Sequence, residues 1–226
     1  TAAFGGSVLR NKYYSTTIAA SQLSSEGPGM YSFANAAVAL DTSPYRSNRQ
    51  TNSLYGFVNL SWDDTYFLDV TARNDWSSTL APSNWSYFYP SVSASIKAFK
   101  INSPHVNMIK LRGSWAQVGN DTSVFSLYDD YSTTDYPGGV TLPTASNYPY
   151  ILPEKTSSWE VGLETKFLGN RLNVDVALYK TSTRNQIISA ETSAETGSTS
   201  RKMNAGLITN KGVEVTFRMV PVRTKD

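Results

Sequence analysis

The stretch Trp159-Glu160-Val161-Gly162-Leu163-Glu164-Thr165-Lys166-Phe167 decides the fold, because large apolar side chains alternate through it with charged or small ones. Successive residues of a β-strand point to opposite faces, so this stretch has one apolar and one charged face. Leu172 to Tyr179 repeats the pattern after the short connection Leu168-Gly169-Asn170. Together the two stretches predict an antiparallel hairpin with an apolar side and a polar side.

The same alternation recurs along the chain and predicts about eight strands. In these stretches the charged residues collect on one face and the other face stays apolar, except in the less regular opening stretch from Phe4 to Ile18. The further stretches run from Phe4 to Ile18, Leu54 to Trp62, Tyr66 to Asp75, Tyr87 to Ala98, Ile109 to Ala116 and Gly212 to Met219.

The lengths of the connections also alternate between short and long. Short links are expected at Asp63-Asp64, Lys100 to Val106 and Leu168 to Asn170, and long ones at Ala19 to Ser47, Ser77 to Asn84, Asn120 to Ser157 and Asn185 to Ala205. Outer-membrane barrels have short periplasmic turns and longer extracellular loops. The predicted fold class is therefore all-β, an antiparallel transmembrane β-barrel segment. A soluble β-sandwich that serves as a surface adhesion or binding module stays open as the alternative, and it would bury the apolar face against its own second sheet.

Composition narrows the range of function classes. The chain has 226 residues, a formal net charge of +2 and no cysteine. It contains no apolar run of the length that a transmembrane helix needs, and its balanced charge argues against a nucleic-acid surface. Thr1-Ala2-Ala3-Phe4 shows no secretory leader and reads as the inside of a strand, so residues 1–226 are expected to be part of a longer protein.

Several separate motifs carry a family resemblance. Those motifs are Leu54-Tyr55-Gly56-Phe57-Val58-Asn59-Leu60-Ser61-Trp62, Tyr66-Phe67-Leu68-Asp69-Val70-Thr71-Ala72-Arg73-Asn74-Asp75-Trp76-Ser77-Ser78, Tyr89-Pro90-Ser91-Val92-Ser93-Ala94-Ser95, Leu111-Arg112-Gly113-Ser114-Trp115-Ala116-Gln117-Val118-Gly119-Asn120, Pro153-Glu154-Lys155-Thr156-Ser157-Ser158-Trp159-Glu160-Val161-Gly162 and Asn210-Lys211-Gly212-Val213-Glu214-Val215. In this order they resemble the barrel portion of SusC/RagA-type TonB-dependent transporters of Bacteroidetes.

The resemblance implies a plugged barrel of about 22 strands, integral to the outer membrane and surrounded by its lipid. It also implies import of an oligosaccharide or peptide, together with a SusD-like lipoprotein and energised by TonB. The plug domain and the TonB box of that family are absent from residues 1–226, which are expected to be part of the β-barrel domain. An isolated arc of about eight strands would leave two unpaired edges and is expected to aggregate.

The alternation assigns side chains to the lumen or to lipid. The residues predicted to face the lumen are Arg73, Arg112, Glu160, Glu164, Lys166, Asp175, Glu214 and Arg218. Those predicted to face lipid are Val161, Leu163, Leu172, Val174, Val176, Val213, Val215 and Phe217. The five tryptophans, Trp62, Trp76, Trp85, Trp115 and Trp159, are expected near strand ends, where aromatic rings form girdles at the membrane interface.

The link from Asn120 to Ser157 is the candidate for contacts with cargo or with the lipoprotein, because its tyrosines offer apolar rings with a polar tip. Packing within the loop is an equal alternative for them. The candidate residues are Tyr128, Asp129, Asp130, Tyr131, Tyr136, Tyr148 and Tyr150. Asp129, Asp130 and Asp135 are better interpreted as a solvated acidic loop than as a calcium site. No catalytic residues, metal site or cofactor are predicted, and the chain is not expected to be an enzyme.

Overall fold

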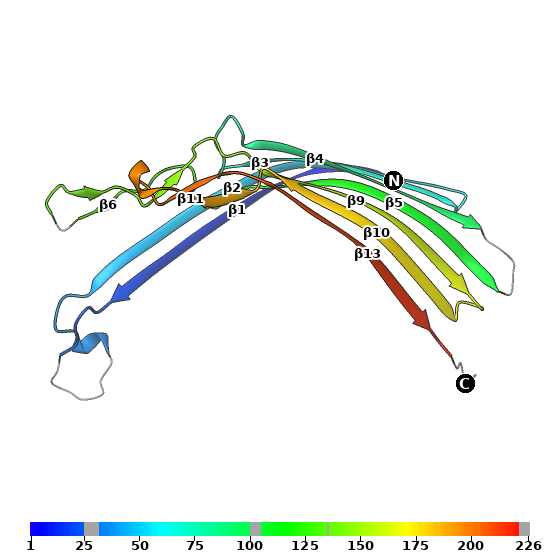
Figure 1. The fold of residues 1–226 in the computed structure, drawn as a ribbon, viewed down its shortest axis with the longest axis horizontal. Helices are drawn as coiled ribbons and strands as arrows, with labels where there is room; N and C mark the ends of the chain where they lie inside the picture. Colours follow the sequence, from blue (N-terminus) through cyan, green and yellow to red (C-terminus); the bar gives the residue numbers. More distant parts are fainter. Residues whose placement is uncertain (25–31, 100–104, 135, 222–226) are drawn as a thin grey trace.

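The computed structural model describes residues 1–24, 32–99, 105–134 and 136–221. Its main feature is one antiparallel sheet of eight strands (Figure 1). The strands are β1 (Ala2–Ala19), β2 (Asp41–Trp62), β3 (Tyr66–Ser77), β4 (Ser86–Phe99), β5 (Val106–Asn120), β9 (Glu154–Phe167), β10 (Leu172–Arg184) and β13 (Leu207–Met219). The number of long strands and their approximate positions confirm the prediction from the alternation.

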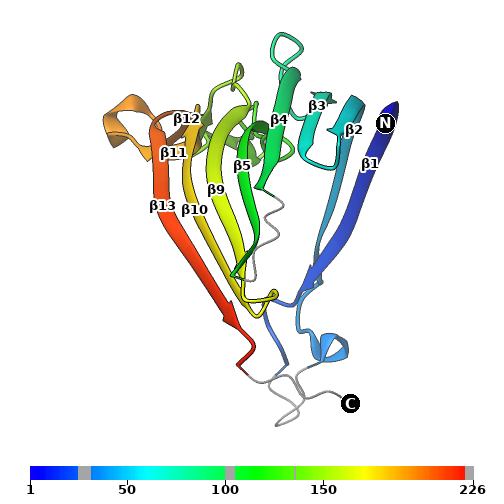
Figure 2. The same cartoon turned by 90° about the vertical axis from the view of Figure 1, so that its right-hand side faces the viewer.

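Neighbours in the sheet follow chain order, β1-β2-β3-β4-β5-β9-β10-β13. Figure 2 shows that the sheet curves like part of a cylinder wall, with β1 at one edge and β13 at the other. Within the described residues these two strands do not pair with one another, so the barrel is not closed by this chain.

Short turns join the strands at one end of the sheet. Asp63 and Asp64 have φ of 51° and 45°, and the amide of Thr65 donates to the carbonyl of Trp62 at 3.0 Å. Acidic and amide side chains tolerate this left-handed conformation better than most residues, which suits them to two-residue hairpins. In the β9–β10 turn, the amide of Gly169 donates to Asn107 Oδ1 at 2.8 Å, so β5 supports its neighbour's turn.

At the opposite end the strands run further than expected (Figure 1). β2 has 22 residues, about twice what is needed to cross a bilayer. The predicted link from Ala19 to Ser47 was therefore too long, because β2 already begins at Asp41 and pairs with β1 from Ala19 onward. That part of the hairpin is rich in polar residues on both faces, so the alternation that marks a strand is lost there.

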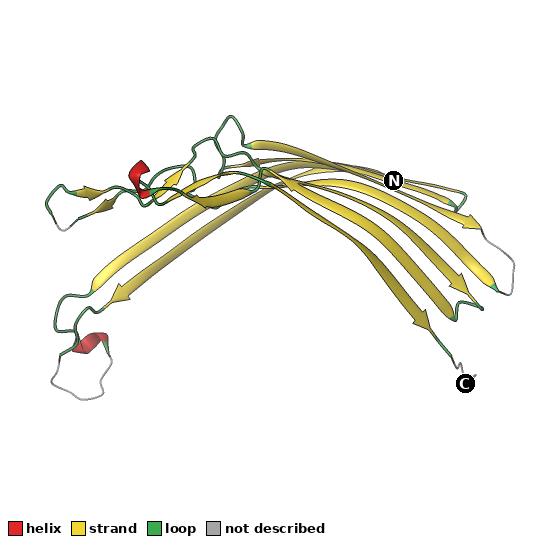
Figure 3. Cartoon of the chain, viewed as in Figure 1, coloured by secondary structure: helices red, strands yellow, loops and turns green. Residues whose placement is uncertain are grey.

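The two longest links also contain strands that sequence patterns did not indicate. β6 (Ser132–Thr133) and β7 (Val140–Thr141) form a small hairpin, and β8 (Ala145–Asn147), β11 (Ile187–Glu191) and β12 (Ser200–Asn204) form a three-stranded sheet. β12 pairs parallel with β8, which joins the loop before β9 to the loop after β10. Figure 3 shows these pieces beyond the end of the large sheet, beside the short helical turn η2 (Ala194–Thr196), whereas the turn η1 (Phe33–Asn35) lies apart from them in the link between β1 and β2.

The apolar face of the large sheet is exposed. Phe4 is 91% exposed, Leu60 55% and Val215 66%. Each of these residues nevertheless has a partner residue on a neighbouring strand. No second sheet packs on this face among the described residues, which is the arrangement of a barrel wall and not of a sandwich. Buried apolar residues are few, and most gather under the loops at the end of the sheet, namely Leu80, Ala81, Leu127 and Ile151.

No helix within the described ranges combines the length and the hydrophobicity needed to cross a bilayer.

The tryptophans are only partly where the sequence placed them. Trp62 ends β2, Trp76 lies next to the end of β3, and Trp85 directly precedes β4. The expectation of a strand end was wrong for Trp115 and Trp159, which face one another inside β5 and β9. Residues 116–120 and 154–158 continue those strands beyond the tryptophan pair toward the long loops.

Candidate functional site

The polar side chains of the sheet share one face, and a contact between non-adjacent strands indicates that this is the concave face. Side chains on the inner side of a curved sheet converge, so residues from non-adjacent strands can touch there. Arg112 of β5 reaches Asp175 of β10 across the whole width of β9. The polar face is also the better covered one, since Asp75 is only 6% exposed.

Arg112, Asp175 and Glu160 form the central charged network of this face. The guanidinium donates to both oxygens of Asp175, at 2.6 and 2.8 Å, in the bidentate geometry that makes such pairs strong. Its Nε lies 3.4 Å from Glu160 Oε1. The structure therefore brings together three of the residues predicted to face the lumen.

Gly162 makes this network possible. It lies directly opposite Arg112 in the β5–β9 register, and the guanidinium passes over it. A Cβ at this position would come within 2.6 Å of Arg112 Cζ, which no real Cβ contact allows. The absence of a side chain in β9 thus opens the path from β5 to β10.

We expect Gly162→Ala to displace Arg112 from Asp175. The loss should be about 1.5–3 kcal/mol, the range for hydrogen bonds to charged groups. Unfolding of the full-length protein in detergent with urea measures it. Gly113→Ala is the matched control, because a Cβ there meets only the carbonyl of Glu160 at 3.9 Å. Equal stabilities of the two variants would contradict this role for Gly162.

A second network surrounds Arg73 in β3. Its Nε donates to Asp75 at 2.8 Å and its NH2 group donates to Ser53 Oγ at 2.9 Å. Tyr89 donates to the other oxygen of Asp75. The Arg73 guanidinium also lies 5.9 Å from the ring centroid of Tyr55 and 6.0 Å from that of Tyr89, within cation–π range.

The other residues predicted for the lumen share this face without joining a large network. Glu164 and Lys166 pair with one another at 3.3 Å. Glu214 and Arg218 lie on the same face of β13, opposite Ala177 and Asn173. Among the described residues neither of them forms an ion pair.

The most buried polar cluster lies where the long loops leave the sheet, and it is centred on Asp121. The Asp121 side chain is 3% exposed and accepts from Arg49 at 2.6 Å, from Thr79 Oγ1 at 2.9 Å and from Ser77 Oγ. It thereby ties β2 and the β3–β4 loop to the loop that follows β5. Leu80, Ala81, Leu127 and Ile151 pack beneath the same loops.

The links before β9 and after β10 are held together by polar side chains. Glu154 accepts from Asn120 at 3.0 Å and from the amide of Ile187 at 2.8 Å. Asn204 of β12 accepts from the amide of Leu152 at 2.7 Å, and its Nδ2 donates to the carbonyls of Leu152 and Asn185, each at 2.8 Å. These side chains fix the loops relative to the ends of the strands.

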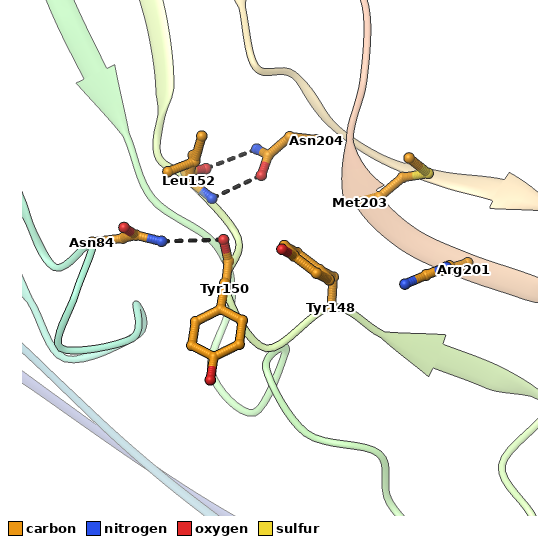
Figure 4. Close-up of a pocket in the computed structure, with 7 residues that line it drawn as sticks. All are labelled: Asn84, Tyr148, Tyr150, Leu152, Arg201, Met203 and Asn204. Atoms are coloured by element: carbon orange, nitrogen blue, oxygen red, sulfur yellow. Dashed lines mark hydrogen bonds between the residues drawn. The ribbon is translucent and has the colours of Figure 1, made fainter.

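These loops line an open pocket of about 460 Å³ (Figure 4). Three segments that are distant in sequence supply its walls: the β3–β4 loop, the segment before β9, and β12. The lining residues are Asn84, Tyr148, Tyr150, Leu152, Arg201, Met203 and Asn204. Tyr148 and Tyr150 meet edge to face, with ring centroids 6.0 Å apart.

The structure thus brings two of the predicted loop residues, Tyr148 and Tyr150, into one site. The other loop tyrosines lie outside it and are exposed, with Tyr128 at 71%, Tyr131 at 55% and Tyr136 at 81%. Asp129 accepts from the amide of Asn147 at 2.6 Å and so supports the loop itself, and both Asp129 and Asp130 are exposed.

Asp135 lies outside the described residues. Within them, no group of three or more His, Cys, Asp or Glu side chains gathers closely enough to hold a metal ion.

Sequence patterns missed Asp121, Arg49, Glu154, Asn204 and Arg201. Asp121 follows a predicted strand, but nothing in the sequence shows that Arg49 would reach it. Arg201 and Asn204 lie in the predicted link from Asn185 to Ala205. The strand β12 was not predicted there, because it is short and its more buried positions carry polar residues. These contacts join loops that are far apart in sequence, so they become visible only in the three-dimensional structure.

Comparisons with known proteins give a consistent result. The family model described as TonB dependent receptor-like, beta-barrel, matches residues 3–220. TonB-dependent receptor P26 of Formosa agariphila is 31% identical over 199 residues, which cover 81% of this chain and 19% of the relative. TonB-dependent receptor SusC of Bacteroides thetaiotaomicron is 28% identical over 222 residues, 89% of this chain and 22% of the relative. The chain therefore spans about a fifth of the length of these curated relatives.

Among solved structures, the RagAB peptide transporter matches with a TM-score of 0.82 and 22% identity, covering all of this chain and 26% of the matched one. The siderophore receptor PirA from Pseudomonas aeruginosa matches with a TM-score of 0.55 over 75% of this chain. At these identities the structural matches establish the fold.

Proposed function

Because this chain belongs to the TonB-dependent receptor-like β-barrel family, we propose that it forms part of the wall of a transporter that imports a nutrient oligomer. The family places the protein in the outer membrane as an integral protein. The cargo is a glycan or a peptide, and import is energised through TonB and assisted by a SusD-like lipoprotein. No bond is made or broken in the cargo.

One observation carries the proposal: the two faces of a single curved sheet have opposite chemistry. The convex face is apolar and exposed, as lipid requires, while the concave face holds the networks of Arg73 and Arg112. A lumen lined by such groups suits passage of a hydrated oligomer. The residues that we accordingly propose to face the lumen are Arg73, Arg112, Glu160, Glu164, Lys166, Asp175, Glu214 and Arg218.

The loops support the second part of the proposal, contact with cargo or lipoprotein. They are built on fixed polar contacts around Asp121, Glu154 and Asn204, so their exposed side chains have defined positions. Ordered loops with exposed tyrosines bind at a low cost in entropy. Tyr128, Tyr131, Tyr136, Tyr148 and Tyr150, with Asp129 and Asp130, remain the candidates for these contacts.

A deletion strain tests the function. Loss of the full-length gene should abolish growth on the cognate oligomer and leave growth on its monomer unchanged, and the full-length product should co-purify with the lipoprotein. Normal growth on the oligomer would contradict the proposal.

Excision of residues 132–141 tests the role of the loop. Ser132 and Thr141 face one another in the β6–β7 hairpin, so a short Gly-Ser linker can close the gap. This excision spares Leu127, which is buried, and β8, which pairs with β12. We expect normal barrel assembly, measured by heat-modifiable gel migration, with reduced uptake or reduced recovery of the lipoprotein. Unchanged uptake together with unchanged co-purification would exclude this hairpin from either contact.

A further inference from the structure

Hydrogen bonds join the walls of the pocket of Figure 4. Asn204 uses both Nδ2 protons and its Oδ1 to hold Leu152 and Asn185 in place. Asn84 Nδ2 donates to the carbonyl of Tyr150 at 3.1 Å and fixes the third wall. A site whose walls are held before a ligand arrives loses little conformational entropy on binding.

The lining combines apolar surface with one positive charge. Tyr148, Tyr150, Leu152 and Met203 supply rings and alkyl groups that remain between a third and three fifths exposed. Arg201 is the charged residue of the lining. No carboxylate lines the pocket, so the site has a net charge of +1 in its described lining.

The guanidinium of Arg201 is available to bind a ligand. Its guanidinium lies 6.0 Å from the ring centroid of Tyr148, which orients it without using its N–H groups. Among the described residues it has no ion-pair partner, in contrast to Arg49, Arg73 and Arg112, each of which meets a carboxylate. An arginine fork presented beside an aromatic ring matches the geometry of a planar carboxylate.

We infer that this pocket is a subsite for a carboxylate-bearing unit of the transported oligomer, with Arg201 on the carboxylate and Tyr148 and Tyr150 against the body of the unit. This inference rests on the proposed import function and narrows its cargo to an acidic oligomer. The carboxylate can belong to an acidic peptide or to a glycan that contains uronic acid, and both present the same group to Arg201.

The test uses the full-length transporter, purified in detergent with its lipoprotein, and isothermal titration calorimetry. Two probes carry carboxylates, trigalacturonate and a hexapeptide of alternating Glu and Ser. Two neutral probes match them, maltotriose and a hexapeptide of alternating Gly and Ser. We expect one acidic probe to bind at least about tenfold more tightly than its neutral match, with an affinity that falls as salt is raised. The acidic probe that binds identifies the source of the carboxylate.

Substitutions then assign the effect to the pocket. Arg201→Gln should lower the affinity for that acidic probe about tenfold or more, and Arg201→Lys should lower it less, because charge remains and the fork is lost. Tyr148→Ala should lower it as well. Arg184→Gln is the matched control, since Arg184 ends β10 at the same end of the sheet and does not line the pocket.

The inference is overturned if neither acidic probe binds better than its neutral match, or if Arg201→Gln leaves the affinity unchanged. It is also overturned if Arg201→Gln releases the lipoprotein without affecting the probes, since the pocket would then be a contact with that partner. Failure of the import function itself is seen separately, as normal growth of the deletion strain on the oligomer.

Discussion

Val174→Arg in the full-length protein should destabilise the barrel by about 2–4 kcal/mol, the cost of a cationic side chain near the middle of the lipid face of a barrel. Val174 and Val176 are at the centre of the apolar run of β10, between Leu172 and Leu178, and face Phe217 and Val215 across the β10–β13 ladder. Unfolding in urea from phospholipid vesicles measures the loss.

Thr216→Arg is the matched control for this substitution. It introduces the same side chain on the adjacent strand but on the polar face, opposite Asp175. A stability near that of the unmodified protein is expected for the control. Comparable losses in both variants would show that the two faces do not differ in their contact with lipid.

Asp121→Ala should have the largest effect on the loops. It leaves Arg49 without its carboxylate and removes the acceptor of Ser77 and Thr79, both of which are buried. Breaking a buried ion pair by removing one partner costs about 3–5 kcal/mol, and the partial exposure of Arg49 places this case at the low end. Hydrogen exchange should report the loss as weaker protection of amides in residues 78–85 and 121–127.

Asp130→Ala is the control for Asp121→Ala, because Asp130 lies in the same loop and is exposed. Its removal should leave amide protection as it was. Unchanged protection in both loops after Asp121→Ala would mean that the apolar cluster of Leu80, Leu127 and Ile151 holds them without the carboxylate. Since Asn84 belongs to one of these loops, Asp121→Ala should also loosen the pocket wall.

The alternation of apolar and polar side chains predicted the sheet. A strand with one face on lipid and the other on water has an apolar residue at every second position. Val161, Leu163 and their partners in β10 and β13 therefore lie on one face, and Glu160, Glu164 and Asp175 on the other, as expected. The tight turns at Asp63-Asp64 and Leu168-Gly169-Asn170 were predicted because they interrupt the alternation of apolar and polar residues. The structure gives these residues positive φ.

The alternation cannot indicate a strand where both faces of that strand contact water, because both faces are then polar. Residues 41–50 of β2 form such a segment, and so do β8, β11 and β12, which were predicted to be loop. Their pairing depends on side chains such as Asn204 and Glu154 that contact residues far away in sequence. Five tyrosines could be proposed as contacts from composition alone, but only the loop-to-loop pairing shows that Tyr148 and Tyr150 share a pocket with Arg201.

The assignment of the two faces to lipid and lumen is tested most directly by labelling two adjacent cysteines in β13. The chain contains no cysteine, so Val215→Cys and Glu214→Cys each introduce a single thiol into these residues at nearly the same depth but on opposite faces. In the full-length protein in outer membranes, the thiol at position 215 should react with a lipophilic maleimide and resist a charged, water-soluble methanethiosulfonate. The thiol at position 214 should show the opposite preference. If position 214 reacted from lipid and position 215 from water, the register would be shifted by one residue and the assignment of the faces would be wrong.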